Sequence, residues 1–201
     1  MSKETGCIIE INLFGLNFIF KTRAGLFSPK AVDAGTLAML EAAFPCFTKG
    51  ARVLDLGCGY GVVGILAAKL CGHNSVFMSD ISPEAVMSAK ENALLNGVPQ
   101  VAAVESSGFA NISEAGFNLI LSNPPYHSDF KIAKEFIEKG FNRLKIGGKM
   151  FMVTKRLDWY KNKFNAIFGG VKITEKDSYF VFMAEKRKPV WANKDAKKNG
   201  S

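Results

Sequence analysis

The run Ser122-Asn123-Pro124-Pro125-Tyr126 has the composition of a reaction site, and it directly follows an apolar segment typical of a strand. The side-chain carbonyl of Asn123 and the backbone carbonyl of Pro124 can both accept hydrogen bonds from one aromatic amine. Such a nitrogen is a poor nucleophile because its lone pair is delocalised, and two acceptors favour its pyramidal form. Prolines stiffen the loop that carries these acceptors. The run therefore predicts attack by a planar nitrogen on a methyl group, with placement rather than a strong base lowering the barrier.

Two rings at the end of this run can contact a substrate. Tyr126 offers a flat face on which a base can stack, a contact worth about 1–3 kcal/mol per base. His127 follows it, although a single loop histidine is more often a surface residue. An Asn-Pro-Pro turn is ordinary by itself, but its place after the fourth expected strand favours a reaction site. We predict catalytic roles for Asn123, Pro124, Pro125 and Tyr126, and substrate contacts for Tyr126 and His127.

A glycine-rich turn at 55–61, DLGCGYG, lies between an apolar strand and an apolar helix. Glycines permit a tight turn and let the backbone approach a ligand closely. A dinucleotide site needs G-x-G-x-x-G to cradle a pyrophosphate, and here the third glycine comes one residue early. Asp55 suits a cationic aminoacid group better than a phosphate, and no basic residue is near. We therefore expect S-adenosylmethionine rather than NAD or FAD, bound by Asp55, Gly57, Cys58, Gly59, Tyr60 and Gly61.

Further cofactor contacts are expected where the next two strands end. Asp80 ends the second strand, where a carboxylate can accept both ribose hydroxyl hydrogens; the alternative is a charge that stabilises the start of a helix. Ile81 follows it. Ser106 and Ser107 end the third strand, where they either read an adenine edge or cap a turn. All of these groups lie at carboxyl ends of strands, where open α/β sheets bind ligands.

Alternating strands and helices are expected to position these residues. Strands are predicted at 52–56, 75–79, 101–105, 117–121, 149–154, 172–175 and 179–184. Helices are predicted at 36–44, from the glycine turn to about 71, at 82–96, at 132–144 with Gly147-Gly148 as its end, and at 158–168. The pattern predicts an α/β fold: a Rossmann-like, doubly wound, mostly parallel seven-stranded sheet with a C-terminal antiparallel hairpin. A separate β-hairpin is expected at 7–20, around Gly15.

Length and composition limit the class of protein. The 201 residues fit one domain with an ordinary core, since the chain is 48% hydrophobic and 22% charged. The four cysteines form no C-x-x-C pair, which argues against a zinc site or a disulfide framework and favours a reduced, cytoplasmic setting. The apolar segment at 7–20 is too short and too polar to span a membrane.

The charge balance points to a polyanionic partner. The net charge is +8, and half of it lies in the tail at 185–201, where six Lys or Arg residues accompany two Asp or Glu residues. For the tail alone, a solvated and partly disordered segment is the simpler interpretation. The candidate phosphate contacts, which predict an affinity that falls steeply with salt, are Lys155, Lys186, Arg187 and Lys188.

These motifs match a known pattern. The runs at 55–61 and 122–126, together with the strand end at Asp80, resemble class I methyltransferases that act on planar nitrogens: adenine N6, guanine N2 and protein glutamine. Residues 25–36, GLFSPKAVDAGT, are similar to the opening segment of the small-domain methyltransferase family. That family includes 16S ribosomal RNA guanine-N2 methyltransferases and compact archaeal relatives, and the resemblance extends from 25 to about 186.

The resemblance implies an organisation of the chain. Residues 1–50 are expected to form the N-terminal hairpin and a segment that covers cofactor and substrate, 51–186 the methyltransferase core, and 187–201 a basic, flexible tail. The covering segment would close over the edge of the sheet and exclude water. Its expected cofactor contacts are Phe27, Asp33 and Gly35, and its expected substrate contacts are Phe27 and Ser28.

The resemblance also implies an S-adenosylmethionine-dependent N-methyltransferase acting on an RNA base. Guanine N2 of ribosomal RNA, free or within the small ribosomal subunit, is the expected target. Tyr126 departs from the Asn-Pro-Pro-Phe common in the guanine enzymes and is typical of tRNA adenine-N6 enzymes, so that base stays open. Protein glutamine-N5 enzymes are a further alternative, but they carry a helical N-terminal domain where a hairpin is expected here. No metal is implied, and the oligomeric state is not predicted.

Two other classes fit less well. DNA adenine methyltransferases normally carry a large target-recognition region, which this chain lacks, as it lacks the degenerate N-terminal domain of the bacterial guanine enzymes. A non-enzymatic binding module would be expected to have lost Asn123 or the glycines, and both are present.

Overall fold

The computed structural model describes residues 6–125 and 130–191. Three predictions therefore lie outside the described residues: the stacking role of Tyr126, the substrate contact of His127, and the flexibility of the tail from 192 onward. None of the helices in the described part of the chain combines the length and the apolar composition that a membrane span requires.

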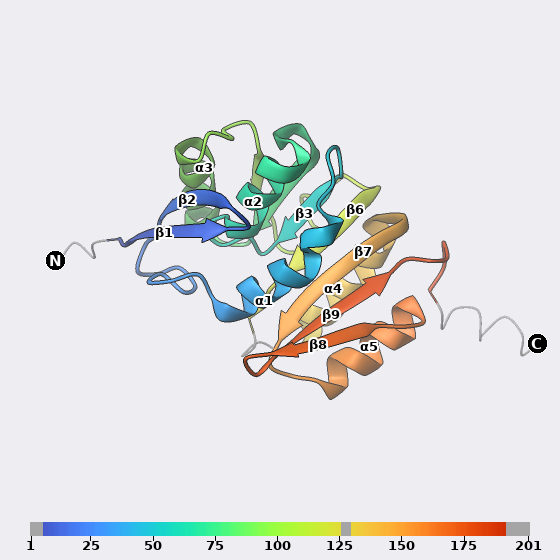
Figure 1. The fold of residues 1–201 in the computed structure, drawn as a ribbon. Coiled ribbons are helices and arrows are strands. Elements are labelled where there is room, and N and C mark those ends of the chain that lie inside the picture. The colour runs from blue at the N-terminus through green and yellow to red at the C-terminus, as the bar shows by residue number, and fades with distance from the viewer. Residues whose placement is uncertain (1–5, 126–129, 192–201) are drawn as a thin grey trace, which may run out of the picture.

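Seven strands form one central sheet in the order β5-β4-β3-β6-β7-β9-β8 (Figure 1). The pairs among β5, β4, β3, β6 and β7 are parallel, and β9 pairs antiparallel with both β7 and β8. The predicted fold class is therefore confirmed. The strands are β3 (Val53–Leu56), β4 (Val76–Asp80), β5 (Ala102–Glu105), β6 (Phe117–Ser122), β7 (Leu144–Thr154), β8 (Lys172–Lys176) and β9 (Tyr179–Glu185).

Helices cover both faces of this sheet, which explains why its strands are nearly continuous apolar runs. Side chains alternate along each strand, so Val53 belongs to one core cluster and its neighbour Leu54 to the other. Three helices pack on the first face and two on the second (Figure 1). These are α1 (Ala34–Ala43), α2 (Val62–Cys71) and α3 (Pro83–Leu95) on one side, and α4 (Phe130–Arg143) and α5 (Asp158–Phe168) on the other. Two short 3-10 helices, η1 (Phe44–Cys46) and η2 (His73–Ser75), join elements of the first layer.

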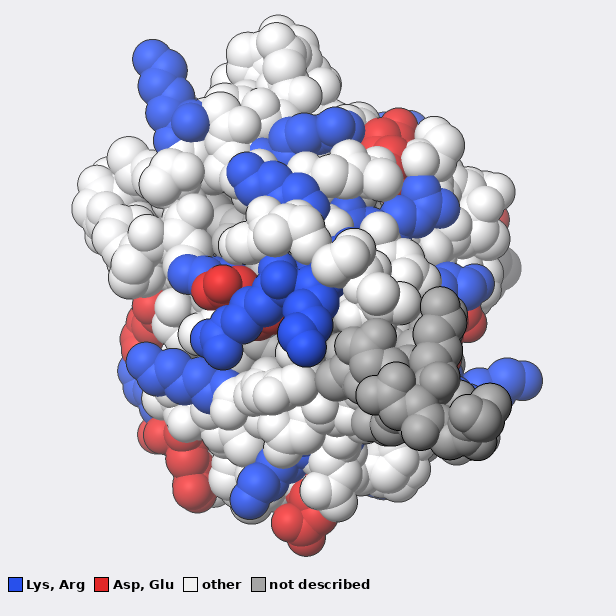
Figure 2. All heavy atoms as spheres, turned by 90° about the vertical axis from the view of Figure 1, so that its right-hand side faces the viewer, with Lys and Arg blue, Asp and Glu red and all other residues white. Residues whose placement is uncertain are grey.

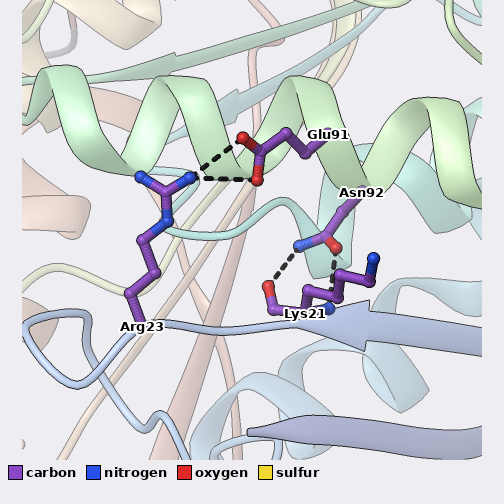
Figure 3. Close-up of polar contacts among 4 residues, drawn as sticks. All are labelled: Lys21, Arg23, Glu91 and Asn92. Carbon is purple, nitrogen blue, oxygen red and sulfur yellow. Dashed lines mark hydrogen bonds and ion pairs between the residues drawn. The ribbon is translucent and has the colours of Figure 1, made fainter. Parts of the chain in front are cut away.

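The N-terminal hairpin, β1 (Ile8–Leu13) and β2 (Leu16–Lys21), forms its own two-stranded sheet. It docks on α3 through two asparagines, because their amides pair with the backbone of β2 as a neighbouring strand would. The Asn92 amide accepts from the Lys21 N–H at 2.8 Å and donates to the Lys21 carbonyl at 3.0 Å (Figure 3). Asn96 repeats this pattern with Ile19. Beside them Arg23 pairs with Glu91 at 2.9 Å.

One predicted boundary is wrong. Gly147-Gly148 does not end a helix, because α4 ends at Arg143 and β7 begins at the next residue. The glycine pair instead sits inside the irregular first half of β7. There the Gly147 N–H donates to the Lys186 carbonyl at 2.8 Å, and the Lys186 N–H donates to the Gly148 carbonyl at 2.9 Å. Strand pairing thus overrides the usual stop signal of two glycines.

Lys186 also differs from its predicted role as a surface phosphate contact. Its side chain is buried, with the residue only 8% exposed. The ammonium donates to the Leu144 carbonyl at 2.9 Å and lies 4.8 Å from the ring centroid of Phe141. Burial lowers its pKa. Lys186 therefore belongs to the core edge, and it does not contribute a cation to the surface.

Candidate functional site

A pocket of about 320 Å³ opens at the carboxyl ends of β3, β4, β5 and β6. Its walls come from four places: the glycine turn at 55–61, the strand ends at 79–81 and 106–108, the turn at 123–125, and the segment at 27–36. The first turns of α4 complete it. Most of the predicted site residues within the described part of the chain therefore line one cavity, and only Gly35 and Gly61 are not among its lining residues.

The glycine turn owes its shape to left-handed backbone conformations. Gly57 and Gly59 have φ values of +80° and +54°, and a Cβ on either would project into open space. The Gly57 and Cys58 N–H groups donate to the Ser79 carbonyl at 2.8 and 2.9 Å, which fastens the turn to the end of β4. Gly61 differs, because its Cβ would lie 3.3 Å from the backbone of Ala89 in α3. Gly61 thus serves the close packing of two helices behind the pocket.

Asp55 places a buried carboxyl group at the floor of the pocket. One carboxylate oxygen accepts from the Gly64 N–H at 2.9 Å, in the first turn of α2. Burial raises the pKa of this carboxyl to about 7, and the nearby charge of Asp80 adds to the rise. A cation in the pocket would favour the ionised form, so the floor is suited to a positively charged ligand group.

Asp80 joins two parts of the pocket wall, the glycine turn and the start of α3. One carboxylate oxygen accepts from the Gly59 N–H and the other from the Ser82 N–H, both at 2.9 Å. Each oxygen retains a lone pair for a further donor. Ser82 also caps α3, since its hydroxyl accepts from the Ala85 N–H at 3.3 Å. The Asp80 carboxylate faces the pocket.

Asn123 is held in a single orientation at the end of β6. Its amide nitrogen donates to the Asp33 carboxylate at 2.8 Å and to the Thr36 hydroxyl at 2.9 Å. Its side-chain carbonyl oxygen is buried and has no hydrogen-bond partner within the described residues. Because both amide hydrogens are used, the amide cannot flip, and the carbonyl remains the group available to a ligand. Ser122 anchors the same strand end through a 2.8 Å bond from its hydroxyl to the Leu56 carbonyl.

Asp33 links this asparagine to two further elements. One oxygen caps α1 by accepting from the Thr36 N–H at 2.9 Å. The other accepts from the Tyr179 hydroxyl at 3.1 Å, which brings in β9. Gly35 makes this approach possible, since a Cβ there would lie 2.6 Å from the Tyr179 ring. Asp33 thus faces the pocket, whereas Gly35 acts through packing behind it.

Comparison with known proteins identifies the family of this chain. The model of the methyltransferase small domain matches residues 17–184, which is most of the chain. The chain belongs to the methyltransferase small domain family. It is therefore a methyltransferase that uses S-adenosylmethionine, in agreement with the buried carboxylate and the glycine turn described above.

Relatives of this small-domain methyltransferase fall into two lengths. The uncharacterized protein YbxB of Bacillus subtilis is 30% identical over 85% of this chain and 87% of its own. Ribosomal RNA large subunit methyltransferase G of Pseudoalteromonas translucida is 30% identical over 86% of this chain and 47% of its own. The structure of the T. thermophilus 16S rRNA N2 G1207 methyltransferase, in complex with AdoMet and guanosine, superposes with a TM-score of 0.81 and 27% identity, over 90% of this chain and 50% of that one. The chain thus spans about half the length of both ribosomal RNA enzymes.

Several pocket residues of this small-domain methyltransferase were not predicted from the sequence. Glu135 and Phe136 line the pocket from α4, and Thr36 lines it from α1. Only tertiary packing brings these helices to the sheet edge, so no local motif marks them. Ser106 takes the turn-capping role left open above: its hydroxyl donates to the Gly108 carbonyl at 2.9 Å and accepts from the Asn111 N–H at 3.0 Å.

One phenol and one thiol that line the pocket, those of Tyr60 and Cys58, have raised pKa values. Burial raises the pKa of Tyr60 to about 12, with the Asp33 charge contributing. The Tyr60 hydroxyl therefore donates, and it points to the carbonyls of Ser28 and Ala31 in the segment at 27–36, at 3.4 and 3.5 Å. Burial likewise raises the pKa of the Cys58 thiol. Within residues 6–125 and 130–191, no three His, Cys, Asp or Glu side chains lie close enough together to hold a metal ion.

Proposed function

We propose that this enzyme methylates an exocyclic amine of an RNA base, with guanine N2 of ribosomal RNA as the target. The observation that carries the proposal is the buried, unpartnered carbonyl oxygen of Asn123 at the wall of the cofactor pocket. A buried acceptor without a partner costs free energy of about 1–3 kcal/mol unless a ligand satisfies it. An aromatic amine supplies the matching donor.

The proposed methyl transfer follows from the orientation of the Asn123 carbonyl toward the pocket. S-adenosylmethionine, when bound, supplies the methyl group and leaves as the neutral thioether. The Asn123 and Pro124 carbonyls accept the two hydrogens of the amine, which directs its lone pair away from the ring. The nitrogen would form its bond to the methyl group as the donor's S–C bond breaks, and the proton that it then loses would pass to solvent. Asp33 and Thr36 hold the Asn123 amide in place, so the residues contribute placement rather than proton abstraction.

The cofactor-binding and covering roles are part of this proposal. Asp55 attracts the cationic amino group, and Asp80 accepts from the ribose hydroxyls. Ile81, 68% exposed at the mouth, and Ser107 border the adenine. The covering segment lies within residues 1–50 and places Phe27 and Ser28 at the substrate, where Phe27 is 52% exposed. The remaining proposed cofactor contacts among the lining residues are Gly57, Cys58, Gly59, Tyr60, Asn123 and Asp33, together with Ser106, whose hydroxyl also caps its turn. Gly35 and Gly61, which were also predicted as contacts, support the pocket from behind.

Two observations favour RNA as the substrate. The names of the ribosomal RNA relatives given above include both large-subunit and small-subunit enzymes, and the structure with guanosine belongs to a guanine-N2 enzyme. The net charge of +8 also suits a polyanion. Adenine N6 of tRNA and glutamine N5 of a release factor remain the competing targets, since the same acceptor pair fits their amine or amide nitrogens.

The deciding experiment offers four substrates side by side with radiolabelled S-adenosylmethionine. They are unmodified 16S RNA, unmodified 23S RNA, bulk tRNA and a release factor, followed by nucleoside or amino-acid analysis. Label in N2-methylguanosine of ribosomal RNA supports the proposal, and the two ribosomal RNAs separate the subunits. Label in N6-methyladenosine of tRNA, or only in the release factor, would overturn the choice of target.

A paired variant tests the role of the acceptor. Asn123→Ala should lower turnover by roughly 10²-fold, the scale of losing one aligned transition-state hydrogen bond, while the Kd for S-adenosylmethionine changes little. Asn165→Ala, on α5 away from the pocket, serves as the matched control. An equal loss of turnover and cofactor binding in Asn123→Ala would contradict the acceptor role.

A further inference from the structure

Two consecutive cations stand beside the reaction turn. Lys155 and Arg156 directly follow β7 and are both exposed. Because β7 runs parallel to β6, with Met152 opposite Ser122, both residues emerge at the edge of the sheet that carries Asn123. The side chains of neighbouring residues diverge, and here they lie against two different rings.

Arg156 lies against the first residue of α4. Its guanidinium is 4.8 Å from the ring centroid of Phe130, the first residue of α4. Phe130 in turn stacks on Trp159 of α5, with centroids 4.4 Å apart and planes 19° from parallel. The stack of Arg156, Phe130 and Trp159 therefore fixes a planar cation at the pocket edge of the sheet, on the face that α4 and α5 cover.

Lys155 lies against a ring on the opposite face of the sheet, which α1 covers. Its ammonium is 4.8 Å from the ring centroid of Tyr179, whose hydroxyl donates to Asp33 at 3.1 Å. Asp33 in turn accepts from the Asn123 amide at 2.8 Å. One ring and one carboxylate thus separate the ammonium from the acceptor of the proposed reaction.

Contact with a ring positions a cation and leaves its charge in place. Some cations of the fold are paired with carboxylates, as Lys176 is with Glu41 and Lys163 with Glu138. Within the described part of the chain, neither Lys155 nor Arg156 has an ion-pair partner. Both therefore present a full, oriented positive charge beside the pocket mouth.

We infer that Lys155 and Arg156 form a phosphate clamp, which holds the RNA backbone on the two sides of the base that enters the pocket. The inference rests on the proposed function and extends it to the way the strand is held. A base that reaches Asn123 must bring the phosphates of its own nucleotide to the mouth, where these two charges stand. The guanidinium can bind a phosphate through two donors, and the ammonium acts as a point charge.

A second basic surface provides the competing site and the control. In Figure 1 the parallel strands run from right to left, so their amino ends lie on the right-hand side, and Figure 2 shows Lys and Arg side chains gathered on that face. Lys145, near the start of β7, and Lys172, which begins β8, are exposed at this edge. The sheet separates them from the pocket, so they cannot contact the phosphates next to a bound base.

The test compares K155Q/R156Q with K145Q/K172Q in the full chain. Binding of a single-stranded oligoribonucleotide that contains guanosine is measured between 50 and 200 mM salt. Each phosphate contact contributes a slope of about −0.7 in log K against log salt for single strands. The slope of log K against log salt should therefore be about 1.4 shallower in the clamp variant, which lacks two contacts. Between 50 and 200 mM salt, the factor by which affinity falls should be about seven times smaller in the clamp variant than in the wild type. K155R/R156K, which keeps both charges, should retain the slope.

Kinetics distinguish this inference from the proposed function. The clamp variant should raise the KM for RNA and leave kcat and the Kd for S-adenosylmethionine unchanged. An unchanged slope in the clamp variant, or a loss confined to K145Q/K172Q, would overturn the clamp. If the wild type methylates only a protein, the proposed function fails, and the salt slopes still decide whether these two residues contact RNA.

Discussion

Replacing Asn92 by alanine should weaken both the fold and the cofactor site, because one buried amide joins three segments. Its carbonyl accepts from the Lys21 N–H, and its nitrogen donates to the carbonyls of Lys21 and Tyr60, at 2.8, 3.0 and 2.9 Å. The residue is fully buried. At about 1 kcal/mol per bond, Asn92→Ala should lower the free energy of unfolding by about 3 kcal/mol. Since Tyr60 belongs to the glycine turn, the substitution should also weaken the binding of S-adenosylmethionine.

Asn96→Ala is the matched control. Its amide also makes three bonds, to the Ile19 N–H and carbonyl and to the Asn92 carbonyl, but it does not contact the glycine turn. Denaturant unfolding should show similar losses in both variants. Calorimetry should show an increase in the Kd for S-adenosylmethionine of about fivefold, equivalent to one hydrogen bond, in Asn92→Ala alone. Equal changes in Kd would refute the idea that the Tyr60 bond shapes the cofactor site.

Three further predictions follow from the site. The free energy of unfolding of the cofactor-free protein should fall as pH rises from about 4 to about 7. Folded Asp55 keeps its proton up to about pH 7, whereas the unfolded side chain, with an ordinary pKa of 3.8, releases it earlier. In Asp55→Asn this contribution to the slope of unfolding free energy against pH should vanish. Gly61→Ala should lower the free energy of unfolding by more than Gly50→Ala, since both glycines have positive φ but only Gly61 faces a neighbouring helix; equal losses in thermal or denaturant unfolding would show that backbone strain is the whole effect. Tyr179→Phe removes the bond to Asp33 and keeps the ring, so kcat should fall several-fold in steady-state assays with little change in the KM for S-adenosylmethionine; an unchanged kcat would mean that Asp33 holds Asn123 without this help.

Local sequence signals predicted the elements and the motifs that border the pocket. The glycine turn, the strand end at Asp80 and the run at 122–125 each follow a strand, and parallel strands bring their carboxyl ends to one edge. The N-cap at Ser82 was likewise readable, because a hydroxyl before Pro83 and Glu84 is a local signal. These features depend only on neighbours in the chain.

The features that escaped prediction depend on contacts between distant residues. Asn123 meets Asp33 across 90 positions, and Asn92 meets Lys21 across 71, so neither pairing leaves a local pattern. Lys186 looks like a tail cation in the sequence and is buried only because Phe141 and the start of β7 pack over it. In each case tertiary packing decides the role of a residue whose type alone leaves it open.

The shared carboxylate of Asp33 has a consequence for the order of events in a catalytic cycle. The same side chain begins α1, at the end of the covering segment, and fixes the Asn123 amide. Any displacement of that segment that withdraws Asp33 also removes one of the two hydrogen bonds that hold the Asn123 amide, and the other is accepted by Thr36 in the same helix. The Asn123 carbonyl is therefore held in its orientation only while this segment is in place. A movement of the segment that admitted a base would also change the orientation of the Asn123 carbonyl. In the proposed reaction, a complex with this segment displaced would hold its methyl donor without a correctly aimed nitrogen, so the donor would be spared from wasteful transfer.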